Sequence, residues 1–471
     1  MARTPVTDVV VVLPGITGSA LADAGGKHLW NLSGNALWQA ARTFGGSVKE
    51  LQLPRDLGDD HPGDGVVATE LIPGFHALAG LWRPVAGYGG LLASLQKTFT
   101  LDPAREGTPG NLLPFPYDWR LSCRYNAELL KTCVDRELGQ WRKSAPERRD
   151  ARVIFVCHSM GGLVARWYVE CLGGHEITRH LITLGTPHRG SMNALDSLVN
   201  GMTKGWGPLS VDLSAFARSL PSLHQLAPDY KCVTVPGGLA NPRDLPGLPG
   251  CDPTLLMDAG EFHAALRKAA AGRSDRTSLQ AVVGVRQPTA TTATYEGDRL
   301  VPLVEIKGKD EGGDGTVPRL AARPGSVANG GYDLEEKHTP CEHHGSLQDN
   351  PGVQDVLWQL LGRPPEFHLA DDDFVPLGVL APSLLEPGEP FEVSVSVPPE
   401  VERHDELRIT AELSRDGDGT PSSRSLANRG EGRYSTTFPA PEPGGYRVVV
   451  QEGKNSAAAV TALTLVCGNG G

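Results

Sequence analysis

The sequence predicts an α/β domain that is followed by an all-β domain. Over most of the 471 residues, short apolar runs rich in β-branched residues alternate with helical patterns. After residue 365 the pattern changes to short segments in which apolar and polar residues alternate. Turns rich in Pro and Gly separate these segments. We therefore place the first domain at residues 1–365 and the second at residues 370–471.

Four apolar runs predict the buried strands of the first domain. They are Val9–Leu13 and residues 153–156, 181–184 and 281–285. Almost every residue in them is apolar, as in parallel strands that are covered on both faces. Helical patterns at residues 125–141 and 163–172 fall between these runs. Strands that alternate with helices indicate a parallel sheet with right-handed crossovers.

Two long segments interrupt this alternation. Residues 22–112 are the first, and residues 191–258 are expected to form a cap on the domain. The cap segment has few strand signals, and its large apolar residues include the following seven: Met192, Met202, Trp206, Leu209, Phe216, Leu220 and Leu223. They suit either a mobile cover over an apolar pocket or a packed helical insertion. The sequence leaves both alternatives open.

The second domain contains three alternating segments, which start at Phe391, Leu407 and Tyr446. Turn signals such as Pro443-Gly444 separate them. About 100 residues of short alternating strands predict an immunoglobulin-like β-sandwich. For this domain we expect a protein or carbohydrate partner.

Composition and charge exclude several classes of function. The chain has 39% hydrophobic and 21% charged residues, typical of a globular protein, and a net charge of −11 at pH 7. This charge argues against a nucleic-acid partner and gives no attraction to anionic lipid. No apolar stretch reaches the ~18 residues of a membrane span, and the N-terminal run is too short for a signal peptide. We therefore expect a cytoplasmic protein with at most peripheral membrane contact.

Ser159 is the candidate nucleophile. It lies between a strand pattern that ends near Cys157 and a helix pattern that follows Gly161. A strand, a sharp turn and a helix make up a nucleophile elbow, which holds a serine hydroxyl above a sheet at a helix N-terminus. Cys157 stands where the G-x-S-x-G pattern has its first glycine. The alternative is a structural serine at a strand-to-helix turn.

A serine nucleophile needs a general base and an acid that orients the base. In α/β-hydrolases the acid follows the serine in the chain, and the histidine comes last. Asp314 lies among glycines at a loop tip, where the alternative is a plain Asp-Gly turn. His344, with His343 as the alternative, precedes a helical pattern and is the candidate base. The order Ser159, Asp314, His344 matches that of an α/β-hydrolase.

The loop directly after the first strand is the candidate oxyanion hole. Its glycines let backbone N–H groups turn inward, so Ile16, with Thr17 as a further candidate, is an expected donor. The residue after the nucleophile, Met160, is the other expected donor. The adjacent histidines have no useful metal-ligand spacing, and the eight cysteines contain no C-x-x-C pair. We therefore expect free thiols, no metal and no cofactor.

Four motifs of the first domain occur together in one known family. They are Leu13-Pro14-Gly15-Ile16-Thr17-Gly18-Ser19, Pro116-Tyr117-Asp118-Trp119-Arg120, His158-Ser159-Met160-Gly161-Gly162 and Gly313-Asp314-Gly315-Thr316-Val317-Pro318. Together they resemble the lecithin:cholesterol acyltransferase family, which includes phospholipid:diacylglycerol acyltransferases and related phospholipases. The resemblance covers roughly residues 8–362 and leaves out the C-terminal domain.

The resemblance implies an α/β-hydrolase fold with a cap and a triad of Ser159, Asp314 and a histidine. The spacing from His344 to Leu347 is similar to that of bacterial lipases, which favours His344. The resemblance also implies backbone oxyanion donors at Ile16 and Met160. For Asp118 and Arg120 we expect a buried pair that holds its loop, rather than contact with substrate.

These observations together predict a serine-dependent hydrolase or O-acyltransferase. Its substrate would be a phospholipid or another lipid ester, and the acyl group would pass to water or to an alcohol. One alternative is a catalytically idle hydrolase fold that serves as a binding module. Another is an effector that degrades membrane lipids.

Overall fold

The computed structural model describes most of the chain. The described residues are 3–31, 50–54, 57–76, 84–105, 107–204, 211–245, 247–272, 278–297, 299–324, 339–362, 375–416, 420–453 and 458–466. Two of the predicted cap residues, Trp206 and Leu209, lie outside these ranges. The domain junction predicted at residues 365–370 lies outside them too.

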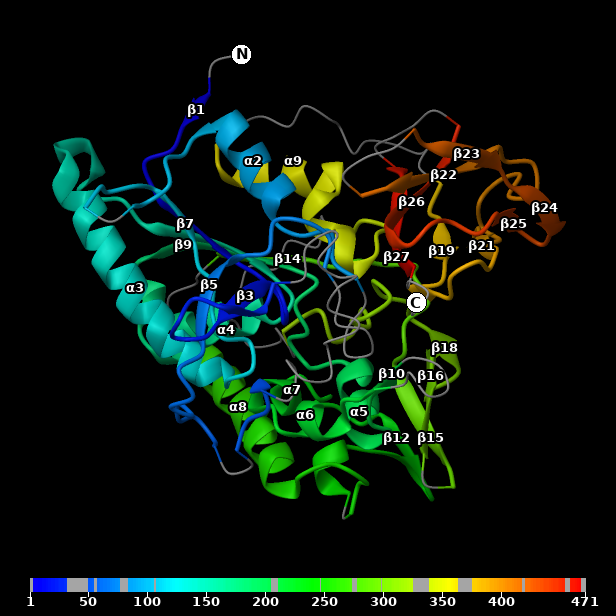
Figure 1. The fold of residues 1–471 in the computed structure, drawn as a ribbon, viewed down its shortest axis with the longest axis horizontal. Coiled ribbons are helices and arrows are strands. Elements are labelled where there is room, and N and C mark those ends of the chain that lie inside the picture. The colour runs from blue at the N-terminus through cyan, green and yellow to red at the C-terminus, as the bar shows by residue number, and fades with distance from the viewer. Residues whose placement is uncertain are drawn as a thin grey trace.

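A five-stranded parallel sheet forms the centre of the first domain (Figure 1). Its strands are β2 (Val9–Leu13), β7 (Leu112–Pro114), β8 (Val153–His158), β9 (Thr178–Leu184) and β14 (Ser278–Val282). Their spatial order is β14-β9-β8-β2-β7, and all four pairings are parallel. The carboxyl ends of β2, β8 and β9 therefore meet at one edge, where this class of sheet binds its ligands.

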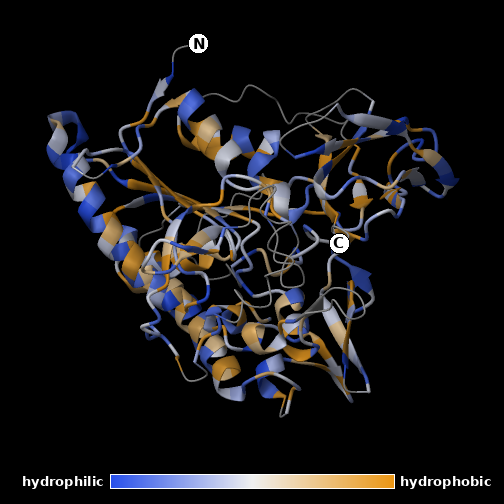
Figure 2. Cartoon of the chain, in the orientation of Figure 1, coloured by the Kyte–Doolittle hydropathy of each residue, from blue (hydrophilic) through white to orange (hydrophobic). Residues whose placement is uncertain are grey.

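Helices cover both faces of this sheet. The odd-numbered residues of β2 pack in the core that also contains α3 (Cys123–Ser144) and α4 (Gly161–Cys171). The even-numbered residues pack with α2 (Gly89–Thr98) and α9 (Pro351–Leu360). Because both faces are buried, β2 is an unbroken apolar run rather than an alternating one. Figure 2 shows the difference between these apolar strands and α3, which has a hydrophilic outer side.

The segment after β9 forms an insertion of short elements. These are α5 (Met192–Val199), β10 (Thr203–Lys204), β11 (Val211–Asp212), α6 (Ser214–Arg218), α7 (Pro221–Gln225), β12 (Val233–Val235) and β13 (Gly238–Ala240), with α8 (Pro253–Ala271) next. Of the seven apolar residues named above for the cap, five are described, and all five are buried in the hydrophobic core that also contains residues of α3 and α4: Met192, Met202, Phe216, Leu220 and Leu223. The insertion is therefore packed onto the domain. Its sheet also includes β15 (Thr292–Glu296) and β16 (Arg299–Leu303), beyond the predicted range.

Two β-sheets make up the C-terminal part. One contains β19 (Gly378–Leu380), β21 (Phe391–Ser396), β25 (Arg433–Phe438) and β24 (Ala427–Gly430). The other contains β20 (Leu384–Leu385), β27 (Val460–Val466), β26 (Gly444–Glu452), β22 (Ile409–Arg415) and β23 (Ser422–Ser425). Inward residues of both sheets share one hydrophobic core. The predicted fold class is confirmed: an α/β-hydrolase fold with insertions, followed by a β-sandwich.

The sandwich packs against the first domain (Figure 1). The Gln287 side chain accepts a hydrogen bond from Val379 N–H (2.9 Å) and donates one to the Leu377 carbonyl (3.1 Å). Arg447 of β26 donates to Asp349 (3.2 Å), just before α9. Apolar residues of both parts share a further small core, which includes Phe75 and Leu463.

Candidate active site

Ser159 occupies a sharp turn between β8 and α4. Its φ is +52°, in the left-handed region that serine seldom adopts. Its backbone N–H donates to the Leu184 carbonyl (2.9 Å), and the Thr186 hydroxyl donates to the Ser159 carbonyl (2.8 Å). A Cβ on Gly161 would lie 2.4 Å from the Pro14 oxygen, so this turn requires a glycine there. Together these features form a nucleophile elbow.

Hydrogen bonds join Ser159, His344 and Asp314. The Ser159 Oγ is 2.9 Å from His344 Nε2, and His344 Nδ1 is 2.7 Å from Asp314 Oδ2. The other carboxylate oxygen, Oδ1, accepts N–H groups from Thr316 (2.9 Å) and Val317 (2.7 Å). A carboxylate only accepts hydrogen bonds, so it keeps the imidazole proton on Nδ1 and leaves Nε2 to accept the Ser159 hydroxyl. All three residues are buried, with at most 1% of their surface exposed.

His343 lies against the C-terminal sandwich. Its Nε2–H donates to the Val379 carbonyl of β19 (3.1 Å). His344 is the first residue of a short 3₁₀ helix, η6 (His344–Asp349), and its N–H donates to the Asp314 carbonyl (2.8 Å). Of the two candidate bases, the structure brings His344 to Ser159.

The loop after β2 lies directly beside the Ser159 side chain. A Cβ on Gly15 would be 2.9 Å from Ser159 Cβ and 3.5 Å from its Oγ. Within the described residues, the N–H groups of Ile16 and Met160 donate to no protein acceptor. Two donors without a protein acceptor at this position are what an oxyanion hole requires.

Aromatic side chains hold this loop in place. The Tyr117 hydroxyl donates to the Pro14 carbonyl (2.8 Å), the Trp30 indole to the Thr17 carbonyl (2.9 Å) and the Trp119 indole to the Ser19 carbonyl (3.2 Å). Three donors therefore position the backbone on either side of Ile16.

Arg120 anchors the neighbouring loop from inside the protein. It is fully buried and binds Asp118 through hydrogen bonds that include Nε to Oδ1 (2.9 Å) and an amino nitrogen to Oδ2 (2.6 Å). A further bond links it to Asp64 (2.9 Å). Asp118 and Arg120 thus form the buried pair that the sequence suggested.

Tyr88 and His158 connect the two halves of the site, and sequence reasoning missed both. Gly15 N–H donates to the Tyr88 oxygen (2.7 Å), and the Tyr88 hydroxyl donates to His158 Nδ1 (2.9 Å). His158 Nε2–H then donates to the His344 carbonyl (2.9 Å). Burial, with His344 nearby, holds the pKa of His158 well below its usual value, so the ring is neutral. The only sequence signal was the position of His158 next to Ser159.

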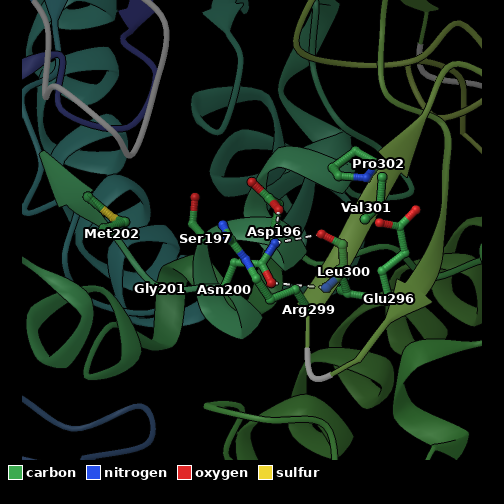
Figure 3. A pocket seen from close by; sticks show the side chains of 10 residues that line it. All are labelled: Asp196, Ser197, Asn200, Gly201, Met202, Glu296, Arg299, Leu300, Val301 and Pro302. Atoms are coloured by element: carbon green, nitrogen blue, oxygen red, sulfur yellow. Dashed lines mark hydrogen bonds between the residues drawn. The ribbon is translucent and has the colours of Figure 1, made fainter.

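A cavity of about 770 Å³ lies in the insertion rather than at Ser159 (Figure 3). It lies between the end of α5 and β16, and is lined by Asp196, Ser197, Asn200, Gly201, Met202, Glu296, Arg299, Leu300, Val301 and Pro302. Asn200 joins its two sides by accepting Leu300 N–H (2.9 Å) and donating to the Leu300 carbonyl (2.7 Å). Ser159, His344 and Asp314 do not line this cavity.

The described residues contain no candidate metal centre, no disulfide and no membrane-spanning helix. No group of three or more His, Cys, Asp or Glu side chains there is arranged to hold a metal ion. Every cysteine in the described ranges is a free thiol. No helix in these ranges combines the length and the apolar character needed to cross a membrane.

The fold, the elbow and the Ser159–His344–Asp314 contacts define a protein of the α/β-hydrolase class. Residues 107–239 match the model of the family described as "Lecithin:cholesterol acyltransferase", which confirms the resemblance seen in the motifs. The matched segment includes Ser159 and ends before Asp314. It supports a lipid ester hydrolase or acyltransferase. No curated protein matches the sequence.

Similar solved structures include two forms of the lipase BlEst2 from Bacillus licheniformis. The mature form is 14% identical, and the similarity covers 76% of this chain and 94% of that one, with a TM-score of 0.37. The propeptide form is 13% identical, and the similarity covers 98% of this chain and 76% of that one, with a TM-score of 0.36. The superoxide reductase (neelaredoxin) from Ignicoccus hospitalis is 20% identical over 19% of this chain and 79% of its own, with a TM-score of 0.15. At TM-scores this low, the similarities carry no information on function.

Proposed function

We propose that this chain is a serine-dependent enzyme that cleaves the acyl ester of a phospholipid or another lipid. The acyl group passes to water or to an acceptor alcohol. The observation that carries the proposal is the hydrogen-bond chain from Ser159 Oγ through the His344 ring to Asp314. The family match at residues 107–239 supports a lipid ester as the acyl donor.

The first half of the reaction forms an acyl-enzyme. His344 Nε2 takes the hydroxyl proton of Ser159, and Oγ attacks the ester carbonyl carbon. Asp314 stabilises the imidazolium that results. The N–H groups of Ile16 and Met160 stabilise the oxyanion. The loss of one such donor raises the free energy of the transition state by about 3 kcal/mol. His344 then gives its proton to the departing alcohol as the ester C–O bond breaks.

The second half releases the acyl group. Water or an acceptor alcohol gives a proton to His344 Nε2, and its oxygen attacks the acyl carbon on Ser159. The tetrahedral intermediate collapses, the proton returns to Ser159 Oγ, and a free fatty acid or a new ester leaves. Water exclusion favours the new ester. Because Ser159 is fully buried, the segments that cover it have to move before an ester reaches Oγ.

Lipid mass spectrometry tests the proposal. The protein is incubated with mixed phospholipid vesicles and an acceptor alcohol, and the products are identified. Free fatty acid would indicate a hydrolase and a new ester an acyltransferase. Ser159→Ala should lose about 10⁴-fold or more in rate, whereas Ser423→Ala, a serine exposed on β23, should keep it.

Two outcomes would count against the proposal. Full turnover by Ser159→Ala would exclude Ser159 as the nucleophile. No product from any lipid ester would favour the idle hydrolase fold.

Growth arrest on expression, lost in Ser159→Ala, would favour the effector. We also expect the insertion, which includes the predicted cap, to make transient contact with a lipid surface, and vesicle sedimentation can test this contact.

A further inference from the structure

The three residues before His344 all contact the C-terminal sandwich. Cys341 belongs to the hydrophobic core between its two sheets. The Glu342 Oε1 accepts the N–H of Thr461 on β27 (2.7 Å). His343 donates through Nε2 to the Val379 carbonyl on β19 (3.1 Å). The short segment that leads into His344 is therefore attached to both sheets of the sandwich.

Glu342 is the centre of these contacts. It is buried, with 1% of its surface exposed. Besides Thr461 N–H, its Oε1 accepts the N–H of His343 (2.8 Å), and its Oε2 accepts the amide of Asn350 (3.1 Å). Asn350 in turn caps α9 by accepting Gly352 N–H (2.9 Å). One side chain thus joins the sandwich, the residue beside His344 and the helix after η6.

The contact with Thr461 occupies a strand edge that would otherwise lack a partner. Among the described strands, β20 pairs with β27 only at Leu465 and Val466. Further back along β27, Glu342 accepts the N–H of Thr461 in place of a neighbouring strand. An unpaired buried N–H costs roughly 1–3 kcal/mol. Loss of the Glu342 carboxyl would therefore disturb both β27 and the His344 segment.

We propose that Glu342 is a positioning residue through which the C-terminal sandwich holds His344 in register with Ser159. The sandwich is then part of the catalytic apparatus rather than a separate binding module. The inference rests on the proposed function, because it gives His344 the role of general base. A misplacement of about 1 Å can lower a catalytic rate by about 10²-fold, and the sandwich would prevent such a shift.

Three variants separate positioning from general stability. Glu342→Leu keeps most of the side-chain volume and removes both acceptor oxygens. Glu342→Gln keeps Oε1 as the acceptor of the two backbone N–H groups. Asp349→Asn is the matched control, because it weakens another contact with the sandwich, the ion pair with Arg447 (3.2 Å). We expect kcat to fall about 100-fold in Glu342→Leu with KM nearly unchanged. It should recover largely in Glu342→Gln and stay close to wild type in Asp349→Asn.

A proton NMR signal measures the position of His344 without turnover. The Nδ1–H shared between His344 and Asp314 should give a far-downfield resonance, assigned by its loss in Asp314→Asn. We expect it to weaken or shift in Glu342→Leu and to persist in Glu342→Gln and Asp349→Asn. An unchanged resonance and kcat in Glu342→Leu would overturn the inference, and so would an equal loss in Asp349→Asn.

A replacement variant and a comparison with Ser159→Ala keep the test decisive. If Glu342→Leu does not fold, His343→Phe replaces it, because it removes the side-chain hydrogen bond to the Val379 carbonyl of the sandwich. A changed resonance in His343→Phe supports the inference, and an unchanged one overturns it. Full turnover by Ser159→Ala would refute the proposed function alone, since the resonance reports the His344–Asp314 hydrogen bond whether or not the chain is an enzyme.

Discussion

At the level of single residues, Ser159 is held in a strained conformation that its surroundings impose. Its positive φ is compensated by the hydrogen bond that its N–H donates to Leu184 at the end of β9, by the bond that its carbonyl accepts from Thr186, and by the close approach of the Pro14 loop. Cys157, which departs from the usual glycine, is an ordinary strand residue of β8 with its side chain in the core. The position therefore does not require a glycine, and the elbow forms without one.

Asp314→Asn should nearly abolish turnover while leaving the fold intact. An amide can donate its own hydrogen to His344 Nδ1, which stabilises the tautomer that cannot accept the Ser159 proton. We expect kcat to fall about 10⁴-fold with little change in KM. Asp310→Asn, in the exposed strand β18 (Lys309–Asp310), is the control for a nearby carboxylate. Near-normal kcat in Asp314→Asn would remove Asp314 from the mechanism.

Tyr88→Phe tests the link between the oxyanion loop and the His344 segment. The variant removes one hydroxyl, which accepts Gly15 N–H and donates to His158. We expect kcat to fall about 10- to 100-fold, because the loop that carries Ile16 loses an anchor. Tyr446→Phe serves as the control, because among the described residues its hydroxyl donates only to the Glu442 carbonyl (2.7 Å) in the sandwich. Equal kinetics in the two variants would contradict this role.

The sequence predicted the reacting groups better than their supports. Ser159, Asp314 and His344 could be proposed because motif, chain order and glycine context are local signals. The choice against His343 depends on which way two adjacent side chains point, and this is decided by the sandwich. Tyr88 left no signal, because its role comes from a contact between segments far apart in the chain.

At the level of elements, glycines set how closely the strand ends approach one another. Gly185, directly after β9, has a φ of +58°, and a Cβ there would lie 2.7 Å from Asp314 Oδ2 and 3.0 Å from His344 Nδ1. A Cβ on Gly284, after β14, would lie 2.5 Å from the Asp314 Cβ. The acid and the base therefore occupy space that side chains at these two strand ends would fill.

Gly185→Ala should be far more harmful than Gly173→Ala. Both residues have a positive φ, +58° and +83°, but nothing lies within 4 Å of a Cβ on Gly173. The backbone strain of about 1–2 kcal/mol is common to both variants, and the clash with Asp314 occurs only in the first. Thermal unfolding and kcat measure the two effects. If both variants lose the same activity, the close packing at Asp314 is not what requires glycine.

Long periodic elements were predictable and short ones were not. The helices predicted at residues 125–141 and 163–172 are α3 and α4, and three of the predicted strand runs are β2, β8 and β9. β7 has only three residues and was missed, while the run predicted at 281–285 is β14, which begins at Ser278 and ends at Val282. The residues at which a strand begins and ends depend on its register with the neighbouring strands, and a single sequence does not specify this register.

At the level of the whole molecule, the two domains share buried polar contacts as well as apolar ones. Glu342 is the clearest case, because burial raises the pKa of its carboxyl from 4.5 to about 8. The folded protein therefore holds a proton at neutral pH that the unfolded chain has released. A group of this kind favours folding most at low pH, and that contribution is lost as the pH rises toward the folded pKa.

Glu342→Gln should make the stability of the protein less sensitive to pH. Between pH 4.5 and about 8, Glu342 lowers the free energy of unfolding of the wild type as the pH rises, by up to ~1.4 kcal/mol per pH unit. Glutamine does not titrate, so the difference in stability between the two proteins should shift in favour of the variant across this range. Urea unfolding at several pH values measures it. Parallel curves would show that Glu342 keeps an ordinary pKa.

The most direct test of the central claim is labelling with a fluorophosphonate, located by peptide mass spectrometry. This reagent reacts with a serine that a general base has activated. The proposed function predicts stoichiometric modification of Ser159, loss of lipid turnover in parallel, and much slower labelling in His344→Ala. An unlabelled Ser159 in a folded protein, or a label on another serine with equal loss of turnover, would contradict it.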